Sequence, residues 1–219
     1  LVLNCVSSGG GGIDGYRRSY VGGMESVVAW AGTAGVGTLV YTGSTSVYPQ
    51  ADGSRVDETA LTGGGERAGV LLEAEARLAA SAAARRFVLR LAGIYGPGRH
   101  HLLEQVRTGE VAGRGEHRLN LAHRDDIADA IWACFEAPSA TKNQIFNVAD
   151  DGAAPKAEIV QWLASRLGVP VPRFSGEPVA GRRAVTPDRT IANAKIKSVL
   201  GWAPRHPTFR EGYENLLSR

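Results

Sequence analysis

The stretch that most constrains the fold is residues 38–49, with the sequence TLVYTGSTSVYP. Its first five residues are mainly β-branched, aromatic or aliphatic, which predicts a short strand buried on both faces. The strand breaks into a glycine followed by three hydroxyl-bearing residues, Ser44, Thr45 and Ser46. Open parallel sheets bind ligands at the carboxyl ends of their strands. The stretch therefore predicts either a ligand site or an ordinary buried strand followed by a serine-rich turn.

The rest of the chain alternates apolar strands with helices. An apolar run of about five residues suits a buried strand, and apolar residues at a spacing of three and four suit a helix. Strands are predicted at 1–6, 38–42, 86–91 and 144–148, and helices at 16–31, 66–84, 101–108, 125–136, 155–167, 191–200 and 209–217. Residues 93–99 are predicted to be a glycine-rich loop after a strand. This alternation predicts an α/β fold with a parallel sheet and right-handed crossovers.

Composition narrows the class of protein. The chain has 219 residues, of which 43% are hydrophobic and 21% charged, which suits one soluble domain with at most a small appendage. The net charge of +3 is spread along the chain, so an anionic small molecule is a better expected partner than nucleic acid. No apolar run reaches the roughly 20 residues of a membrane span. Cys5 and Cys134 lie in apolar runs and are predicted to be buried reduced thiols, as expected in the cytoplasm.

The first residues are unusual for a natural start. The chain does not begin with Met, and residues 1–6, LVLNCV, already have the pattern of a buried strand. This pattern is typical of a fragment, although a strand can also lie at a true terminus.

Seven motifs, taken together and in order, resemble a known family. They are GSTSVYP (43–49), VDET (56–59), LEAE (72–75), VLRLAGIYGPGR (88–99), NLAHRDDIADAI (120–131), IFNVADD (145–151) and LGWAP (200–204). The set is similar to the extended short-chain dehydrogenase/reductases, and within them to the NAD-dependent epimerase/dehydratase proteins that act on nucleotide sugars. The resemblance implies a doubly wound Rossmann sheet with a small carboxyl-terminal substrate lobe. It divides the chain into residues 1–98, the second half of the dinucleotide-binding domain, and residues 99–219, a lobe interleaved with the strand at 144–148.

The resemblance also implies the cofactor, NAD or NADP. The family's glycine fingerprint, which places the cofactor pyrophosphate on a helix amino terminus, is absent from this chain. We therefore expect the amino-terminal half of the cofactor site to be missing. The remaining cofactor contacts carry over to the end of the first strand, to the end of the second, and to the loop that closes over the nicotinamide. These positions are Cys5, Val6 and Ser7, then Thr42 and Gly43, then Tyr95, Gly96 and Pro97.

The catalytic residues implied by the family are only partly present. Its Tyr and Lys, four residues apart, exchange a proton with the substrate hydroxyl, and a Ser or Thr holds the same oxygen. Ser44 matches the hydroxyl, but Arg67 and Leu71 occupy the Tyr and Lys positions. Arg67 stays cationic and so can bind an anion but cannot accept a proton. No His, Cys or acid pair has metal-ligand spacing, so no metal is expected.

Further side chains are candidates for the substrate site and for the proton-transfer group. Residues expected to meet the substrate are Thr45, Ser46, Arg67, Arg99, Arg182 and Arg183, the arginines because their forked donors match phosphate oxygens. Tyr48, His100, His101 and His123 could replace the missing phenol, but each also has an ordinary structural interpretation as a motif, surface or orienting residue.

Two functions remain open at this point. The first is an NAD(P)-dependent oxidoreductase, epimerase or dehydratase with an altered active site, acting on a small molecule such as a nucleotide sugar. The second is a non-catalytic dinucleotide-binding module that senses cofactor or binds a partner. The family further implies a homodimer that pairs through the helices at 16–31 and 66–84, with no nucleic acid or membrane partner.

Overall fold

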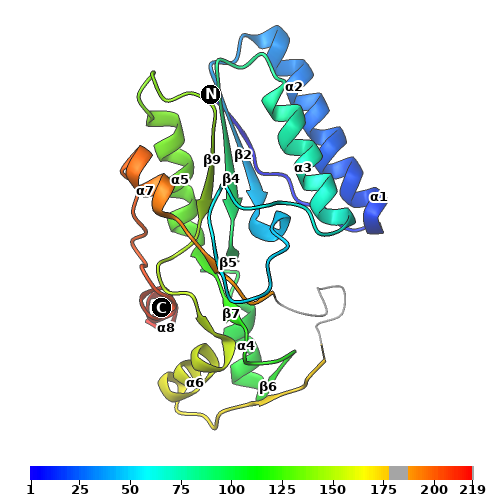
Figure 1. Ribbon diagram of the computed structural model, residues 1–219. Helices are drawn as coiled ribbons and strands as arrows, with labels where there is room; N and C mark the ends of the chain where they lie inside the picture. Colours follow the sequence, from blue (N-terminus) through cyan, green and yellow to red (C-terminus); the bar gives the residue numbers. More distant parts are fainter. Residues whose placement is uncertain (178–186, 219) are drawn as a thin grey trace.

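The computed structural model describes residues 1–177 and 187–218, and its centre is a four-stranded parallel sheet (Figure 1). The strands are β1 (Val2–Asn4), β2 (Thr38–Ser44), β4 (Arg85–Leu91) and β9 (Gln144–Val148), in the order β1-β2-β4-β9. All three neighbouring pairs are parallel. The α/β fold and its four predicted strands are therefore confirmed, but β1 is shorter than the predicted 1–6 and Leu3 within it is 40% exposed rather than buried.

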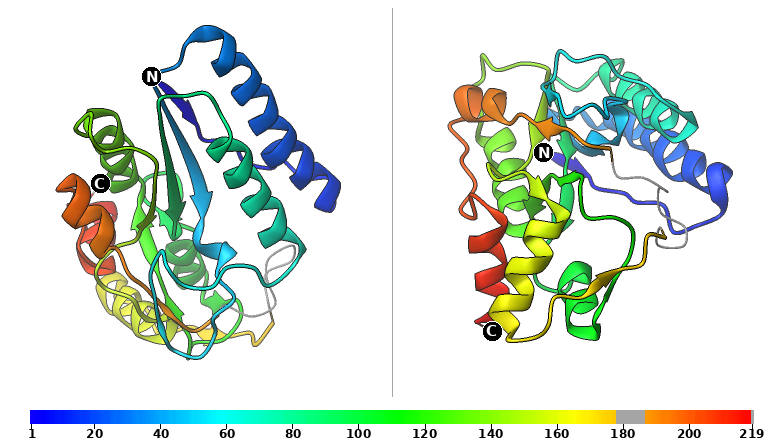
Figure 2. Two further views of the ribbon diagram at one scale, coloured as in Figure 1. Left: turned by 45° about the horizontal axis from the view of Figure 1, so that its top comes forward. Right: turned by 60° about the horizontal axis from the view of Figure 1, so that its bottom comes forward.

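Helices cover both faces of this sheet, as Figures 1 and 2 show. On one face lie α1 (Gly12–Arg17), a π-helical segment (Arg18–Gly22), α2 (Gly23–Ala34) and α3 (Glu66–Ala79). On the other lie α5 (Arg124–Glu136) and α7 (Ala194–Leu200). Burial on both faces explains why the first four residues of β2 are all buried, and why its sequence is continuously apolar or β-branched rather than alternating.

A smaller lobe lies beyond the carboxyl ends of the strands (Figure 1). It contains α4 (His101–Thr108), α6 (Lys156–Leu167) and α8 (Phe209–Leu217). These helices share an apolar core of their own, which includes Leu103, Val106, Ile159, Leu163, Phe209 and Tyr213.

Four short strand pairs connect the lobe and the loops around the sheet. They are β5 (Gly93–Tyr95) with β8 (Leu121–His123), β6 (Glu110–Val111) with β11 (Arg173–Phe174), β7 (Arg118–Leu119) with β10 (Ala154–Pro155), and β3 (Arg55–Val56) with β12 (Thr190–Ile191). None of the helices in the described part of the chain is long and apolar enough to cross a membrane.

Several predicted boundaries were wrong, for tertiary reasons. The helix predicted at 191–200 begins at Ala194, because Thr190 and Ile191 pair with β3 instead. The helix predicted at 66–84 ends at Ala79, since alanine-rich sequence carries no stop signal and the next residues turn toward β4. The loop predicted at 93–99 opens as β5, which pairs with β8. Cys5 is exposed rather than buried, because β1 pairs only with β2 among the described strands and ends at Asn4.

Candidate functional site

The carboxyl ends of the central strands meet along one edge of the sheet. Ser44, the last residue of β2, is opposite Leu91 of β4, which is opposite Val148 of β9. On the other side of β2, Asn4 at the end of β1 is opposite Tyr41. The segments that follow these strands therefore converge, as expected for the ligand edge of an open α/β sheet.

Ser44 stands at this edge, half-buried, where β2 turns into a short 3-10 helix (Thr45–Val47). Its Oγ accepts a hydrogen bond from the Ser46 amide at 3.1 Å and so caps that helix. A serine hydroxyl that accepts one bond still carries a donor hydrogen. Thr45 is buried, and its hydroxyl donates to the Leu91 carbonyl at 3.2 Å. Ser44 and Ser46 are thus the more accessible of the three hydroxyls.

The residues expected to contact the cofactor lie at the same edge of the sheet, but the side chain of one of them, Tyr95, packs in the lobe. Thr42 and Gly43 are in β2, and Cys5, Val6 and Ser7 are exposed just beyond β1. Tyr95 is 3% exposed and packs in the lobe core, 5.2 Å from the His123 ring and 4.9 Å from the Tyr213 ring.

Tyr95 is fixed there by a glycine of α8. A Cβ on Gly212 would lie 1.8 Å from the Tyr95 hydroxyl oxygen, so this helix position must be glycine. The Tyr95 side chain is therefore part of the lobe core, and Gly96 and Pro97 are the residues of this loop that stay predicted to contact a cofactor. In that loop Gly96 has a φ of 140°, which a side chain rarely adopts.

The two positions of the missing dyad have different surroundings. Arg67 is exposed in the first turn of α3, with its guanidinium carbon 5.6 Å from the centre of the Tyr16 ring. Leu71, one turn later, is 1% exposed and belongs to the main apolar core. A buried leucine there packs the helix against the sheet and supplies no charge. Arg99 is exposed after the loop at 93–98, while Arg182 and Arg183 lie outside the described residues.

A buried polar network beneath the site was not predicted. Arg90 of β4 donates from Nε and Nη2 to the two carboxylate oxygens of Glu75 on α3, at 2.9 and 2.7 Å. Arg90 Nη1 also donates to the Tyr48 hydroxyl at 2.9 Å, and that hydroxyl donates to Asn147 Oδ1 at 2.8 Å. The sequence did carry a signal for this pair. Glu75 shares the apolar face of α3 with Leu71 and Leu78, and Arg90 lies inside the apolar strand β4, so each carries a charge in apolar surroundings and the two charges are of opposite sign.

This network gives Tyr48 a structural role. Burial raises the pKa of the Tyr48 hydroxyl, although the hydrogen bond from Arg90 opposes the rise. For Arg90, burial acts to lower the pKa, but the bonds to Glu75 outweigh it and the pKa is raised. The phenol therefore stays protonated and the guanidinium charged. Tyr48 is held away from the role of a general base.

His123 belongs to a second polar cluster, between α5 and the segment before α8. It is fully buried, and its Nδ1 accepts a hydrogen bond from the Asp125 amide at 3.3 Å, capping α5. The Asp126 carboxylate accepts bonds from the Arg205 and His206 amides at 3.0 and 3.2 Å and lies 3.1 Å from His206 Nδ1. His123 thus orients the backbone at the start of α5, which agrees with its interpretation as an orienting residue.

The same cluster is close enough to suggest a metal site. Ligand atoms of His123, Asp126 and His206 all lie within 4.8 Å of one another. However, the two imidazole rings are 3.9 Å apart between centroids and inclined by only 36°, so they stack. Two imidazoles that bind one ion point at it from different directions and do not stack. The arrangement favours a packing contact between α5 and the carboxyl-terminal segment.

His100 and His101 lie on the surface of the lobe. His100 is 3.3 Å from Glu104 and His101 is 3.1 Å from Gln105, each one helical turn away in α4. Such contacts on one helix are common at protein surfaces. Neither residue touches the turn at Ser44 through an interaction that the structure records.

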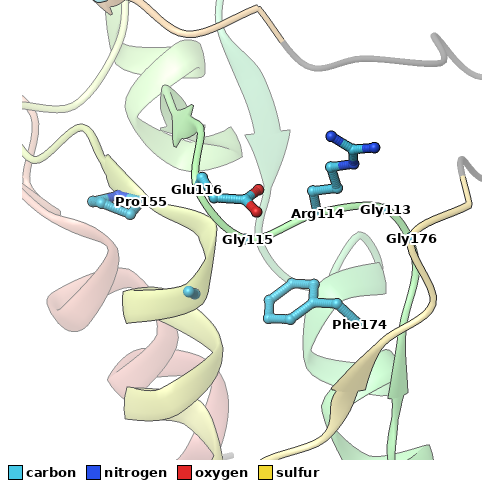
Figure 3. A pocket seen from close by; sticks show the side chains of 8 residues that line it. Gly113, Arg114, Gly115, Glu116, Pro155, Phe174 and Gly176 are labelled. Atoms are coloured by element: carbon cyan, nitrogen blue, oxygen red, sulfur yellow. The ribbon is translucent and has the colours of Figure 1, made fainter.

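The lobe contains a pocket of about 360 Å³ between β6, β11 and the start of α6 (Figure 3). The Phe174 ring and the Arg114 and Glu116 side chains surround it. A Cβ on Gly115 would lie 2.9 Å from Ala157 and 3.1 Å from Phe174, so glycine lets the backbone approach the ring closely. The full lining is Gly113, Arg114, Gly115, Glu116, Pro155, Ala157, Phe174 and Gly176.

Comparison with known families agrees with this geometry. The model of the NAD dependent epimerase/dehydratase family matches residues 12–149, which is more than half of the chain. The match spans β2, β4 and β9 and the turn at Ser44. The chain therefore belongs to this family, and the resemblance noted in the sequence is confirmed.

Individual relatives cover the chain unequally. "Protein YeeZ" of Escherichia coli (strain K12) is 28% identical over 188 residues, which are 86% of this chain and 65% of that protein. A "3-diazoavenalumate denitrifying reductase" of Streptomyces sp is 31% identical over 150 residues, 62% of this chain and 48% of that protein. The chain thus spans about two thirds or less of the length of these relatives.

A solved structure, MoeE5 in complex with UDP-glucuronic acid and NAD, superposes with a TM-score of 0.83. It is 24% identical in sequence, and the match covers 97% of this chain and 76% of MoeE5. The superposition shows that the two proteins share a fold.

Proposed function

We propose that the chain is part of an NAD(P)-dependent oxidoreductase of the epimerase/dehydratase type with an altered active site. The observation that carries the proposal is the position of Ser44, a half-exposed hydroxyl at the ligand edge of the sheet in a chain of this family. The residues present suit the nicotinamide half of a dinucleotide, because the segment after β1 is exposed beside that edge. A bound nicotinamide would accept or supply the hydride.

The side chains of this chain would bind and orient the substrate. Ser44 Oγ would donate a hydrogen bond to the substrate oxygen whose carbon exchanges the hydride. Arg67, in the first turn of the adjacent α3, would stabilise negative charge but not remove a proton. The proton on the substrate oxygen would then exchange with water and not with a tyrosine at the family's usual position, since residues 58–75 contain neither Tyr nor Lys.

We propose a nucleotide sugar as the substrate. The pocket beside Phe174 offers an aromatic face for a base and the Arg114 guanidinium for a phosphate oxygen. Arg99, Arg182 and Arg183 are further proposed phosphate contacts. The MoeE5 complex, whose described ligands are UDP-glucuronic acid and NAD, supports this class of substrate.

The assembly and compartment are also proposals. We infer a homodimer through α1–α2 and α3, where Trp30 of α2 is 53% exposed, and a reducing cytoplasm, which suits the free cysteines Cys5 and Cys134. A clean monomer by light scattering at high concentration would contradict the dimer.

A second function is favoured by the dyad positions. Arg67 on the surface and Leu71 in the core replace the proton-transfer pair, which suits a module that binds dinucleotide without turnover. Such a module would sense cofactor or bind a partner protein.

One experiment separates the two functions. The full-length protein is incubated with NAD and UDP-glucuronic acid or UDP-glucose, and reduced nicotinamide and sugar products are measured. Ser44→Ala is expected to lower the rate on the order of 10²-fold. The matched control is Ser26→Ala, whose hydroxyl bonds the Gly22 carbonyl on the exposed side of α2. NAD binding without turnover would favour the non-catalytic module, and full activity of Ser44→Ala would move the active site elsewhere.

A further inference from the structure

Arg189 reaches the turn at Ser44 from the far end of the chain. It is 5% exposed and directly precedes β12. Its Nη1 donates to the carbonyls of Tyr48 and Gln50 at 2.6 and 3.0 Å, and its Nη2 donates to the Thr45 carbonyl at 3.0 Å. All three acceptors lie within six residues of Ser44 in the sequence. One guanidinium thus binds the beginning, middle and end of the segment that leaves β2.

The chemistry of these bonds requires arginine. Burying a guanidinium is costly unless its donors are satisfied. The planar fork of arginine can hold several carbonyls at fixed angles, whereas a lysine ammonium is a single point of charge. The Thr45 carbonyl also accepts a bond from the Tyr48 amide at 3.2 Å, which closes the 3-10 turn. Arg189 therefore binds the same oxygen that closes the turn capped by Ser44.

Arg189 is itself held in place from both sides. The Asp188 carbonyl accepts a bond from the Gly53 amide at 2.8 Å, and the Asp188 carboxylate pairs with Arg118 at 2.9 Å. On the other side, the Asn193 side chain donates to the Ala149 carbonyl at 2.8 Å, just beyond β9. The segment 188–193 thus spans the ligand edge from the loop after β2 to the loop after β9.

We propose that Arg189 is a positioning residue for Ser44. It fixes the carbonyls of the turn so that the Ser46 amide stays on Ser44 Oγ and the serine hydroxyl hydrogen points out of the turn. This proposal rests on the proposed function for its catalytic consequence, while its structural claim stands on the three carbonyl bonds. A misplacement of about 1 Å in such a group can lower a rate on the order of 10²-fold.

The chain provides a matched control at the opposite end of the sheet. Arg85, at the start of β4, donates to the carbonyls of Ala137 and Phe135 at 2.6 and 3.3 Å and to the Thr38 hydroxyl at 3.1 Å. Like Arg189, it is an arginine whose guanidinium donates to the backbone carbonyls of another segment. Because it lies at the amino ends of β2 and β4, its loss should affect folding without affecting the turn at Ser44.

The test compares Arg189→Met, Arg189→Lys and Arg85→Met in the full-length protein. Amide hydrogen exchange is measured for residues 44–50 and 135–138, together with kcat and KM for UDP-glucuronic acid and KM for NAD. Arg189→Met is expected to raise exchange at 44–50 and to lower kcat about 10- to 100-fold, with both KM values changed less than about threefold. Arg189→Lys should recover part of the loss. Arg85→Met should raise exchange only at 135–138 and leave kcat unchanged.

Two results would overturn the proposal. The first is unchanged exchange at 44–50 in Arg189→Met, or in Arg189→Lys if the methionine variant does not fold. The second is raised exchange with a kcat equal to that of Arg85→Met, which would make Arg189 a stability residue only. If the wild-type protein turns over neither nucleotide sugar, the proposed function fails, and the exchange pattern alone then decides whether Arg189 orders the turn.

Discussion

The two buried polar clusters of this protein differ in how completely their titratable atoms are paired. In the cluster between α3 and the sheet, both oxygens of Glu75 bind Arg90, and the Tyr48 hydroxyl both accepts and donates. Its one buried atom without a partner among the described residues, Asn147 Nδ2, belongs to an amide that does not titrate. The second cluster, around His123, lies where the sheet meets the lobe, and Asp150 adjoins it through a hydrogen bond from its amide to the Leu121 carbonyl of β8 at 2.7 Å. There His123 Nε2 and Asp150 Oδ2 are buried with no hydrogen-bond partner among the described residues. The first cluster balances its charges, whereas the second buries titratable atoms without doing so.

The difference appears in the pKa values. Burial raises the pKa of Asp150 to about 7, and the bond from the Gly152 amide only partly opposes this. Burial, helped by the neighbouring His206, lowers the pKa of His123. We therefore expect Arg90 to stay charged across the neutral range and Asp150 to change protonation within it. The stability of the contact between the sheet and the lobe should depend on pH, whereas the stability of the contact between α3 and the sheet should not.

The largest expected effect comes from breaking the paired cluster. Glu75→Ala leaves the Arg90 guanidinium buried without its carboxylate and should lower the free energy of unfolding by about 3–5 kcal/mol. Urea unfolding followed by circular dichroism measures this loss.

The double variant Glu75→Leu with Arg90→Met is the control for this prediction. It removes both charges and keeps apolar volume, so it should lose less stability than Glu75→Ala alone. Equal losses in the single and double variants would mean that the charges themselves stabilise the fold. A loss below about 1 kcal/mol for Glu75→Ala would mean that the pair is solvated in the protein.

The central sheet was predictable because its signals are local. Each strand is a run of apolar residues, and β9 was predicted at its observed bounds. Ser44 could be placed because it stands at the end of the apolar run that forms β2. Arg67 and Leu71 could be assigned to the helix that follows β2, now α3, because the signal for that helix is also local.

The rest depended on contacts between distant residues. Arg189 lies 141 residues from Tyr48, and an isolated arginine in an irregular segment carries no sign of what it binds. The exposure of Cys5 depends on which strands lie beside β1, which its own apolar sequence does not encode. Tyr95 ends the short strand β5, where a loop was predicted, and its direction into the lobe is set by Gly212 of α8.

The second expected effect concerns Asp150. Its folded pKa of about 7 lies above the usual value of 3.8, so the folded state holds the proton more tightly than the unfolded chain. Its contribution to stability is complete below about pH 4 and is lost as pH rises through about 7. Asp150→Asn keeps the shape without the charge and should raise the free energy of unfolding at about pH 8 by about 2–4 kcal/mol. Near pH 4 the two proteins should have equal free energies of unfolding.

The matched control is Asp151→Asn, at the exposed neighbouring residue. A gain in stability as large in that variant would contradict the assignment to Asp150.

The smallest expected effect concerns His123, whose pKa burial and His206 hold below its ordinary value. A depressed histidine pKa means that the unfolded chain binds a proton first, so stability falls as pH drops through the unfolded value of about 6.5. His123→Asn should remove this fall, because asparagine does not titrate and its side-chain oxygen can still accept the Asp125 amide at the start of α5. Between about pH 7.5 and pH 5, the wild-type protein should lose roughly 1 kcal/mol more free energy of unfolding than the variant.

Thermal unfolding at both pH values measures this difference, with His101→Asn on the lobe surface as the control. If His123→Asn and the wild-type protein lose the same stability on acidification, the titrating group is elsewhere, and the contrast between the paired and unpaired clusters would rest on Asp150 alone.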